Sequence, residues 1–428
     1  MAKHTSPELR KLNIYKLFIR NFTEMGTINA IHSELDRIKH LGTDVICFLP
    51  FYPTGQKQRK GSLGSPYAVK DHREVDPELG TIEDFKRLVI EIHKREMKVM
   101  IQVVLNHTSP DSPLMDDHPE WYYKKPDGSL GNRFGDWKDI VDLDYQNLDL
   151  WVYQIGMLRE WAKIVDGFHC NFAPLLPLKF WRLARREIKK IKPHFIWMAE
   201  GIENKFIREL RSLQIVAYSD AELFQEFDIT DEYDVYDDFM YYLAGEIPLS
   251  QYIHVLNMQE ISFPSNYVKA QFLENHDKER IPIYLEDIDN LIQWTAFKHL
   301  QKGANILNNG QEVASNKRLS LIDKDPINWQ TGINLSMFIA RVSAIEKTHI
   351  PIVNVYYHLE AYDDLDTVVM YYTDAVEKRI GVFNLKHHDG QVPVNVPDGE
   401  YENLITQSTL KIEDGKINIK DTPCFFIC

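Results

Sequence analysis

The sequence has few cysteines, fewer basic than acidic residues and no long apolar run. Its four cysteines in 428 residues have no metal-binding spacing, which argues against a disulfide scaffold or a zinc module. The net charge of −14 argues against nucleic acid or an anionic membrane as a partner. The start, Met1–Ser6, has no apolar core, and no stretch is long enough to span a bilayer. We therefore expect a cytoplasmic protein with reduced, buried thiols.

What the sequence does contain is a regular alternation of strand and helix patterns. Hydrophobic residues make up 44% of the chain, enough for one large domain with one or two smaller ones. Short apolar strands alternate with amphipathic helices up to about residue 350. The strands are expected at Leu12–Ile19, Val45–Leu49, Val99–Leu105, Val165–Cys170, Phe195–Ala199, Glu222–Phe227, Ala270–Leu273 and Ala304–Leu307. Eight such units predict an α/β fold, a (β/α)8 TIM barrel.

Two other segments depart from this alternation. Residues 107–147 are rich in proline, glycine and aromatic residues, and we expect a small subdomain inserted after the third strand. Residues 351–428 contain short strands between turns, which predicts a C-terminal antiparallel β-sandwich domain. The barrel itself is then formed by residues 1–106 and 148–350. The insertion's aromatic residues are expected to form its own small core; they are Trp121, Tyr122, Tyr123 and Trp137.

Polar side chains gather where four of the predicted barrel strands end. The segments are Gln102–His107, Gly167–Asn171, Trp197–Glu200 and Phe272–Asp277. In an α/β barrel the carboxyl ends of the strands carry the chemistry. Taken in this order, the four segments resemble the signature segments of the α-amylase family of glycoside hydrolases, family 13. One such segment alone is a weak signal, whereas four in order are a strong one.

The resemblance implies roles for particular residues. Glu200 takes the position of the general acid/base, and Asp277 that of the carboxylate that stabilises the transition state. The substrate-binding positions it implies are Tyr67, His107, His276 and Arg280. Asn106 takes the position of a possible calcium ligand, and no other cofactor is implied. The partner implied is an oligosaccharide or α-glucan, and the oligomeric state stays open.

The second segment departs from the family pattern at two positions. The family has Asp as nucleophile where this chain has Asn171, and Arg where it has His169. A neutral amide cannot form the glycosyl ester at a useful rate, and losing such a group costs several orders of magnitude. The two changes are coupled, since removing the Asp alone would leave a buried, unpaired Arg at a cost of about 3–5 kcal/mol. We interpret both as native residues of a degenerate site. Gln102, where the family usually has Asp, points the same way.

Three hypotheses follow from these residues. In the first, the protein binds α-glucan or a related sugar, and its hydrolytic activity is absent or strongly reduced. In the second, it is an active hydrolase or transglycosylase in which Glu200 and Asp277 act as an inverting pair through a water. In the third, the barrel is a non-enzymatic interaction scaffold. Retention of Glu200, His276 and Asp277 argues against the third.

Overall fold

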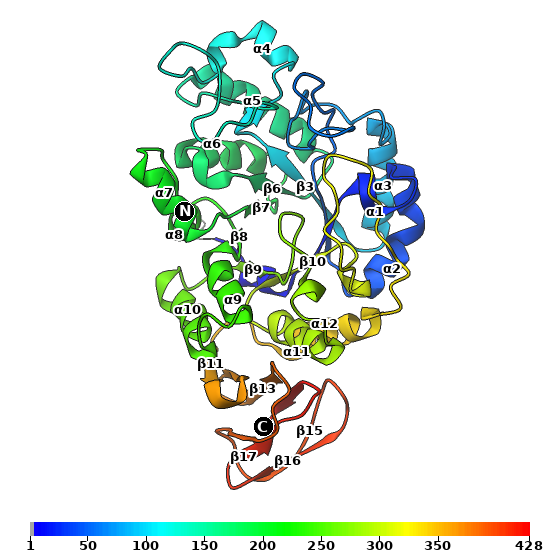
Figure 1. Ribbon diagram of the computed structural model, residues 1–428, viewed down its shortest axis with the longest axis vertical. Coiled ribbons are helices and arrows are strands. Elements are labelled where there is room, and N and C mark those ends of the chain that lie inside the picture. The colour runs from blue at the N-terminus through cyan, green and yellow to red at the C-terminus, as the bar shows by residue number, and fades with distance from the viewer. Residues whose placement is uncertain (1–3) are drawn as a thin grey trace.

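The fold is a closed barrel of eight parallel strands, seen in a computed structural model that describes residues 4–428 (Figure 1). Around the barrel the strand order is β1-β10-β9-β8-β7-β6-β3-β2. The expectation for Met1–Ser6 thus lies partly outside the described residues. The strands are β1 (Asn13–Leu17), β2 (Val45–Phe48), β3 (Lys98–Val104), β6 (Gly167–Asn171), β7 (Ile196–Ala199), β8 (Ile229–Asp231), β9 (Lys269–Gln271) and β10 (Ala304–Asn308). The predicted TIM barrel is confirmed.

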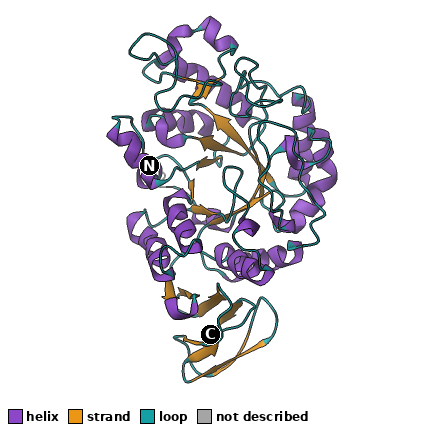
Figure 2. Cartoon of the chain, in the orientation of Figure 1, coloured by secondary structure: helices purple, strands orange, loops and turns teal. Residues whose placement is uncertain are grey.

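Helices form an outer layer around the barrel, as Figure 2 shows. The helices are α1 (Ile19–Phe22), α2 (Leu35–His40), α3 (Ile82–Lys94), α4 (Pro113–Asp117), α5 (Leu148–Ala162), α6 (Leu178–Lys189), α7 (Asn204–Ser212), α8 (Asp220–Leu223), α9 (Tyr236–Leu243), α10 (Leu249–Ser262), α11 (Ile288–His299) and α12 (Ser336–His349). Of these, α4 lies in the inserted segment rather than in the outer layer (Figure 1). Helix α3 illustrates how the sequence defines the start of a helix. The hydroxyl of Thr81 accepts from the backbone N–H of Asp84 at 3.1 Å, and the Asp84 carboxylate accepts from the backbone N–H of Thr81 at 2.8 Å.

The sixth strand lies later in the chain than the sequence pattern predicted. Glu222–Phe227 was expected to be a strand, but that prediction is wrong: α8 ends at Leu223, and β8 begins at Ile229. The backbone N–H of Ser219 donates to the Glu222 carboxylate at 2.8 Å, which starts a helical turn. The buried side chains of Leu223, Phe224 and Phe227 therefore follow helical spacing rather than strand alternation. The shift matters because Asp231, at the end of β8, reaches the barrel interior.

The segment after β3 forms a small layer of its own over one side of the barrel. Its strands β4 (His107–Thr108) and β5 (Val141–Asp142) pair antiparallel. The indole of Trp121 and the ring of Tyr122 are buried, whereas Trp137 is 37% exposed. Trp121 and Tyr122 belong to the same buried cluster as the side chains of the barrel, so the prediction that they form a separate core of the insertion is wrong, and Trp137 lies outside that cluster.

The last part of the chain forms two four-stranded antiparallel sheets below the barrel in Figure 1. One sheet has the order β11-β12-β13-β18 and the other β14-β17-β16-β15. Side chains from both sheets, among them Val369, Val382, Val392 and Ile412, form one buried cluster, as in a sandwich. The strands are β11 (Tyr356–Tyr362), β12 (Thr367–Thr373), β13 (Lys378–Asn384), β14 (Gln391–Pro393), β15 (Gly399–Glu402), β16 (Thr409–Glu413), β17 (Lys416–Asn418) and β18 (Cys424–Ile427).

Two further sequence expectations concern thiols and membranes. Cys47, Cys170 and Cys424 are free and buried, and Cys428 is free and half-buried. Within residues 4–428, no helix has the length and apolar character needed to traverse a bilayer.

Candidate active site

The barrel brings the predicted catalytic positions to one rim. Asn171 ends β6, Glu200 directly follows β7, and Asp277 lies in the loop after β9. Since all eight strands run parallel, their carboxyl ends meet at the same edge. The three side chains line one cavity of about 200 Å³ together with Tyr67. The remaining lining residues are Phe172, Gly201, Ile202, Glu203, Phe206, Tyr233 and Lys278.

Glu200 is held by two neutral amide side chains. The amide of Asn171 donates to one carboxylate oxygen of Glu200, and Gln102 Nε2 donates to the other at 3.0 Å. The amide orientation of Gln102 is set by Tyr67, whose hydroxyl donates to Gln102 Oε1 at 3.0 Å. Two of the three positions that depart from the family pattern, Asn171 and Gln102, thus contact the general acid position. At position 171 the cavity is therefore lined by a neutral amide and not by a carboxylate that could act as nucleophile.

Burial controls the protonation of Glu200. The residue is 5% exposed, and burial, followed by repulsion from Asp277, raises the pKa of Glu200 to about 8, against an opposing effect of Lys16. At neutral pH the carboxyl group therefore carries a proton. A protonated carboxyl facing a cavity is the form that a general acid requires.

This raised pKa makes the stability of the fold depend on pH. Because the folded-state pKa lies above the unfolded value of about 4.3, the contribution of Glu200 is complete below that value and is lost as the pH rises through about 8. We expect Glu200→Gln to gain stability over the wild type between about pH 5 and about pH 9, by roughly 2–5 kcal/mol. Urea unfolding at both pH values measures this difference. Glu246→Gln, at an exposed position, is the control, and a pH-independent difference for Glu200→Gln would contradict the assignment.

Asp277 completes the polar wall of the cavity, and the buried imidazole of His276 lies beside it. His276 Nε2 lies 3.3 Å from Asp277 Oδ2 and shares a short hydrogen bond with the hydroxyl of Tyr67. Burial lowers the pKa of His276 to about 4, so the imidazole is neutral at pH 7. The Asp277 side chain is 46% exposed and is available to a ligand. One oxygen each of Glu200 and Asp277 lie within 4.8 Å of one another.

Of the four predicted substrate-binding residues, Tyr67 lines this cavity, and His107, His276 and Arg280 do not. His107 is 2% exposed, and its Nε2 lies 3.1 Å from the backbone carbonyl of Tyr67. The guanidinium of Arg280 is buried against Glu274 at 3.0 Å and donates to the carbonyls of Asn309 and Ser315. Both side chains support the loops that carry the cavity.

Sequence reasoning missed two charged residues beneath the cavity. Lys16 lies on β1 and Asp231 ends β8, and their side chains are 1% and 0% exposed. Lys16 Nζ donates to Asp231 Oδ2 at 3.2 Å, and His169 Nε2 lies 3.2 Å from the same oxygen. A lysine within the apolar run Asn13–Leu17 was the available signal, because a buried lysine requires a partner.

The residues around Asn106 do not fit a calcium ion. Asn106 Nδ2 donates to Asp142 Oδ1 at 3.4 Å, and the backbone N–H of Arg133 donates to Asp142 Oδ2 at 2.8 Å. The Arg133 guanidinium lies 3.7 Å from Asp142 and 3.5 Å from Asp144. Calcium needs six to eight oxygen ligands, and here a guanidinium already stands beside the two carboxylates.

A second cluster of potential metal ligands lies deeper in the barrel. His169, Glu200 and Asp231 each place one ligand atom within 4.8 Å of the others. The ammonium of Lys16 is bonded to Asp231 and already supplies positive charge there. A dication beside it would be repelled, so this cluster does not fit a metal either.

A larger cavity of about 650 Å³ adjoins the first one and shares Phe172 and Phe206 with it. It runs between the inserted segment and α7 and is lined by aromatic and aliphatic side chains, including Tyr123, Phe134 and Trp137. Phe172 directly follows Asn171 and has φ of 47°. A left-handed backbone is rare for a bulky residue, and such strain concentrates at functional sites.

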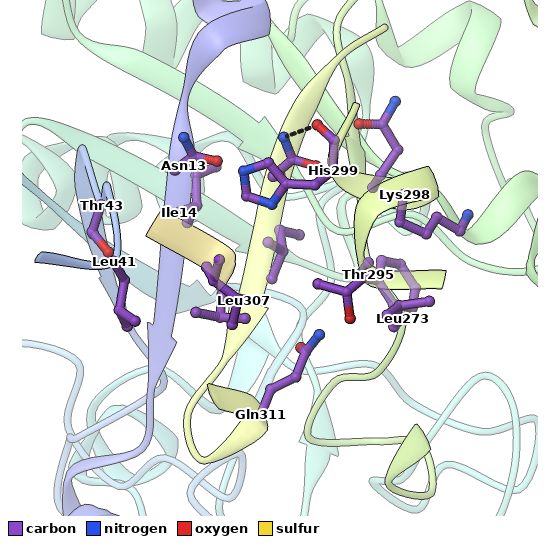
Figure 3. Close-up of a pocket in the computed structure, with 15 residues that line it drawn as sticks. Asn13, Ile14, Leu41, Thr43, Leu273, Thr295, Lys298, His299, Leu307 and Gln311 are labelled. Carbon is purple, nitrogen blue, oxygen red and sulfur yellow. Dashed lines mark hydrogen bonds between the residues drawn. The ribbon is translucent and has the colours of Figure 1, made fainter. Parts of the chain in front are cut away.

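A third cavity, drawn in Figure 3, has a different character. It lies between β1, β10 and α11 and has a volume of about 30 Å³, which is the space of about one water molecule. Among the residues that line it, the side-chain amide of Asn305 donates a hydrogen bond of 3.0 Å to the carbonyl of His299. Figure 3 draws this bond as a dashed line. The cavity is too small for a sugar.

Comparison with known proteins agrees with this geometry. Residues 17–348 match the family described as alpha amylase, catalytic domain, and residues 358–426 match the bacterial alpha amylase C-terminal domain. The crystal structure of an α-amylase from Lactobacillus plantarum is 38% identical, with a TM-score of 0.94 over 99% of this chain and 100% of that one. A noncanonic maltogenic α-amylase from Thermotoga neapolitana is 28% identical, with a TM-score of 0.86 over 98% of this chain and 99% of that one.

A group of longer relatives also matches part of the chain. The alpha-1,4-glucan:maltose-1-phosphate maltosyltransferase of Pseudomonas aeruginosa is 32% identical over 223 residues, which is 46% of this chain and 33% of that protein. The chain thus matches about a third of the length of that relative. The catalytic-domain match, in contrast, covers well over half of the chain, and on that ground the chain belongs to the α-amylase family of glycoside hydrolases.

Proposed function

We propose that this protein binds α-glucan chains or related oligosaccharides in the cavity around Glu200 and that its hydrolytic activity is absent or strongly reduced. One observation carries the second half of this proposal. Asn171 stands where the nucleophile belongs and donates its amide to Glu200. A neutral amide in that position offers neither a nucleophile nor a charge for the oxocarbenium-like transition state.

Sugar binding is supported by the shape and lining of the two cavities. The smaller one presents the carboxyl groups of Glu200 and Asp277, which suit sugar hydroxyl groups. The larger one, at about 650 Å³ with aromatic walls, is in the size range of small-molecule sites. The names of the relatives, an α-amylase and an α-1,4-glucan maltosyltransferase, favour an α-1,4-glucan as the ligand.

A second candidate function is weak glycosidase activity that uses Asp277 in place of the missing nucleophile. Glu200 and Asp277 approach within 4.8 Å. An inverting pair needs about 6.5–9.5 Å to admit a water, whereas a retaining pair is about 5–5.5 Å apart. The closest oxygens of the two groups thus lie nearer to the retaining range than to the inverting range. Any residual activity would retain the anomeric configuration.

Calorimetry and turnover assays on the same protein test these functions. We expect a maltooligosaccharide or acarbose to bind with micromolar to millimolar affinity, without product release over hours. Asp277→Asn should weaken binding, by about 1–3 kcal/mol for a lost hydrogen bond to a charged group. The exposed Asp149→Asn on α5 is the matched control.

Each other outcome assigns a different function. Turnover that disappears in both Glu200→Gln and Asp277→Asn, with retained configuration in the product, would replace the first proposal by the second. No heat of binding at millimolar sugar would instead favour an interaction scaffold.

A further inference from the structure

A buried group of charged and polar residues lies beneath the sugar cavity, and the proposed function does not use it. Lys16 comes from β1, His169 from β6 and Asp231 from β8. All three side chains are at most 1% exposed. Both Lys16 Nζ and His169 Nε2 lie 3.2 Å from the same oxygen, Asp231 Oδ2. Three distant strands thus converge on one carboxylate.

This group lies against the general acid position. Atoms of His169, Asp231 and Glu200 lie within 4.8 Å of one another, and β8 neighbours β7, which Glu200 follows. Burial raises the pKa of Asp231, but Lys16 and His169 together outweigh this effect and lower that pKa to about 2. Burial, and then Lys16, lower the pKa of His169, so the imidazole is neutral. The cluster therefore carries one cation and one anion.

The same two charges are the ones missing from β6. An Arg at 169 and an Asp at 171 would place a cation and an anion on the inner face of that strand, where this chain has a neutral imidazole and an amide. Lys16 and Asp231 restore one charge of each sign, from β1 and β8. A buried ion pair is weak evidence for stability, since apolar residues often replace it at no cost. Its place directly beneath Glu200 points to a role in the site.

We propose that Lys16 is a positioning residue of the sugar cavity: anchored by Asp231, its ammonium supplies a positive charge beneath Glu200 in place of the residue pair absent from β6. This inference deepens the proposed function and rests on it only in taking Glu200 as the sugar-facing acid. Besides Lys16 and Asp231, the groups that face Glu200 are His169, His276 and Asp277. His169 and His276 are neutral at pH 7 for the reasons given above, so the other charged side chains of the cavity lining are Asp277 and the ion pair of Lys278 with Glu203.

The test is a titration of Glu200 by side-chain carbon NMR in four proteins without sugar, with Glu200→Gln assigning the signal. The proteins are the wild type, Lys16→Met, Asp231→Asn and Lys16→Met/Asp231→Asn. In Asp231→Asn the freed ammonium has Glu200 as its nearest remaining carboxylate, so Glu200 should titrate at least about one pH unit lower. In Lys16→Met the carboxylate of Asp231 remains without its cation, and the pH at which Glu200 titrates should rise by a similar amount. In the double variant the two effects should largely cancel.

A merely structural ion pair would behave differently. Lys298 on α11 is also buried and pairs with Glu232, so Lys298→Met should lower stability and leave the Glu200 titration unchanged. If Lys16→Met does not fold, the titrations of Asp231→Asn and of the double variant still test the inference. The double variant leaves no buried charge unpaired. Titration of Glu200 at the wild-type pH in Asp231→Asn would overturn the inference. Loss of sugar binding in any of these proteins would bear on the proposed function alone, because the titration contains no sugar.

Discussion

Returning the charged pair to β6 is expected to restore hydrolysis, but fully only when the cluster beneath it is neutralised at the same time. Asn171→Asp alone should do little, because the new carboxylate lacks a cationic partner and is partly protonated. His169→Arg/Asn171→Asp should exceed either single variant by on the order of 10³-fold, because the two groups act as a unit. Adding Lys16→Met/Asp231→Asn should raise the rate again, by about tenfold or more.

The contacts of His169 explain the extra step. Its Nε2 lies 3.2 Å from Asp231 Oδ2. An arginine at position 169 is therefore expected to pair with Asp231 rather than with an aspartate at position 171. Lys16 already occupies that carboxylate and would repel the guanidinium. His169→Arg alone therefore crowds a fully buried site and is expected to destabilise the fold by about 1–3 kcal/mol. With Lys16 and Asp231 neutral, the guanidinium is free to pair with residue 171.

The measurement is hydrolysis of an aryl α-glucoside and of maltooligosaccharides by the wild type, the two single variants, the double variant and the quadruple variant. Thermal melts and sugar calorimetry on each protein separate inactivity from unfolding. Lys16→Met/Asp231→Asn in the wild-type background is the control and should remain inactive. A quadruple variant that folds, binds sugar and stays inactive would show that the pair is not sufficient. Gln102, which donates to Glu200, would then be the next position to restore.

Most of the fold was predictable because the barrel strands have one simple property. They are buried on both faces, so they appear as short apolar runs such as Val45–Phe48 and Lys98–Val104. The exception was the sixth strand. Its three residues, Ile229–Asp231, are too short and too polar for the pattern, and the apolar residues of the preceding helical turn attracted the prediction instead.

The site was predictable where the sequence resembles a family and not where the chain has its own solution. Glu200 and Asp277 meet in one cavity, as the order of the segments led us to expect. The partnership of Lys16 with Asp231 joins strands 215 positions apart in the chain, and no local pattern encodes such a contact. Arg280 was predicted to bind substrate from the resemblance to the family. Its side chain in fact turns away from the cavity into a buried ion pair.

Because of that ion pair, the loss of the Arg280 side chain is expected to lower the stability of the fold strongly. The Arg280 and Glu274 side chains are 3% and 0% exposed, and their charged atoms lie 3.0 Å apart. The guanidinium also donates to the backbone carbonyls of Asn309 and Ser315 at 3.2 and 3.0 Å. It thereby joins the loop after β9, which carries Asp277, to the loop after β10.

Arg280→Met would leave Glu274 buried without its cation and two carbonyls without a donor. Breaking a buried pair in this way costs about 3–5 kcal/mol, and we expect urea unfolding to show that loss. Glu274→Gln/Arg280→Met should cost less than the sum of its single variants, because neither charge is then left alone. Arg318→Met is the matched control. That arginine is 46% exposed and 3.6 Å from Glu279, so its loss should change stability by less than about 1 kcal/mol. Where Arg280→Met remains folded, its sugar affinity should equal that of the wild type. A loss of affinity without a loss of stability would return Arg280 to the substrate-binding role that the resemblance implied.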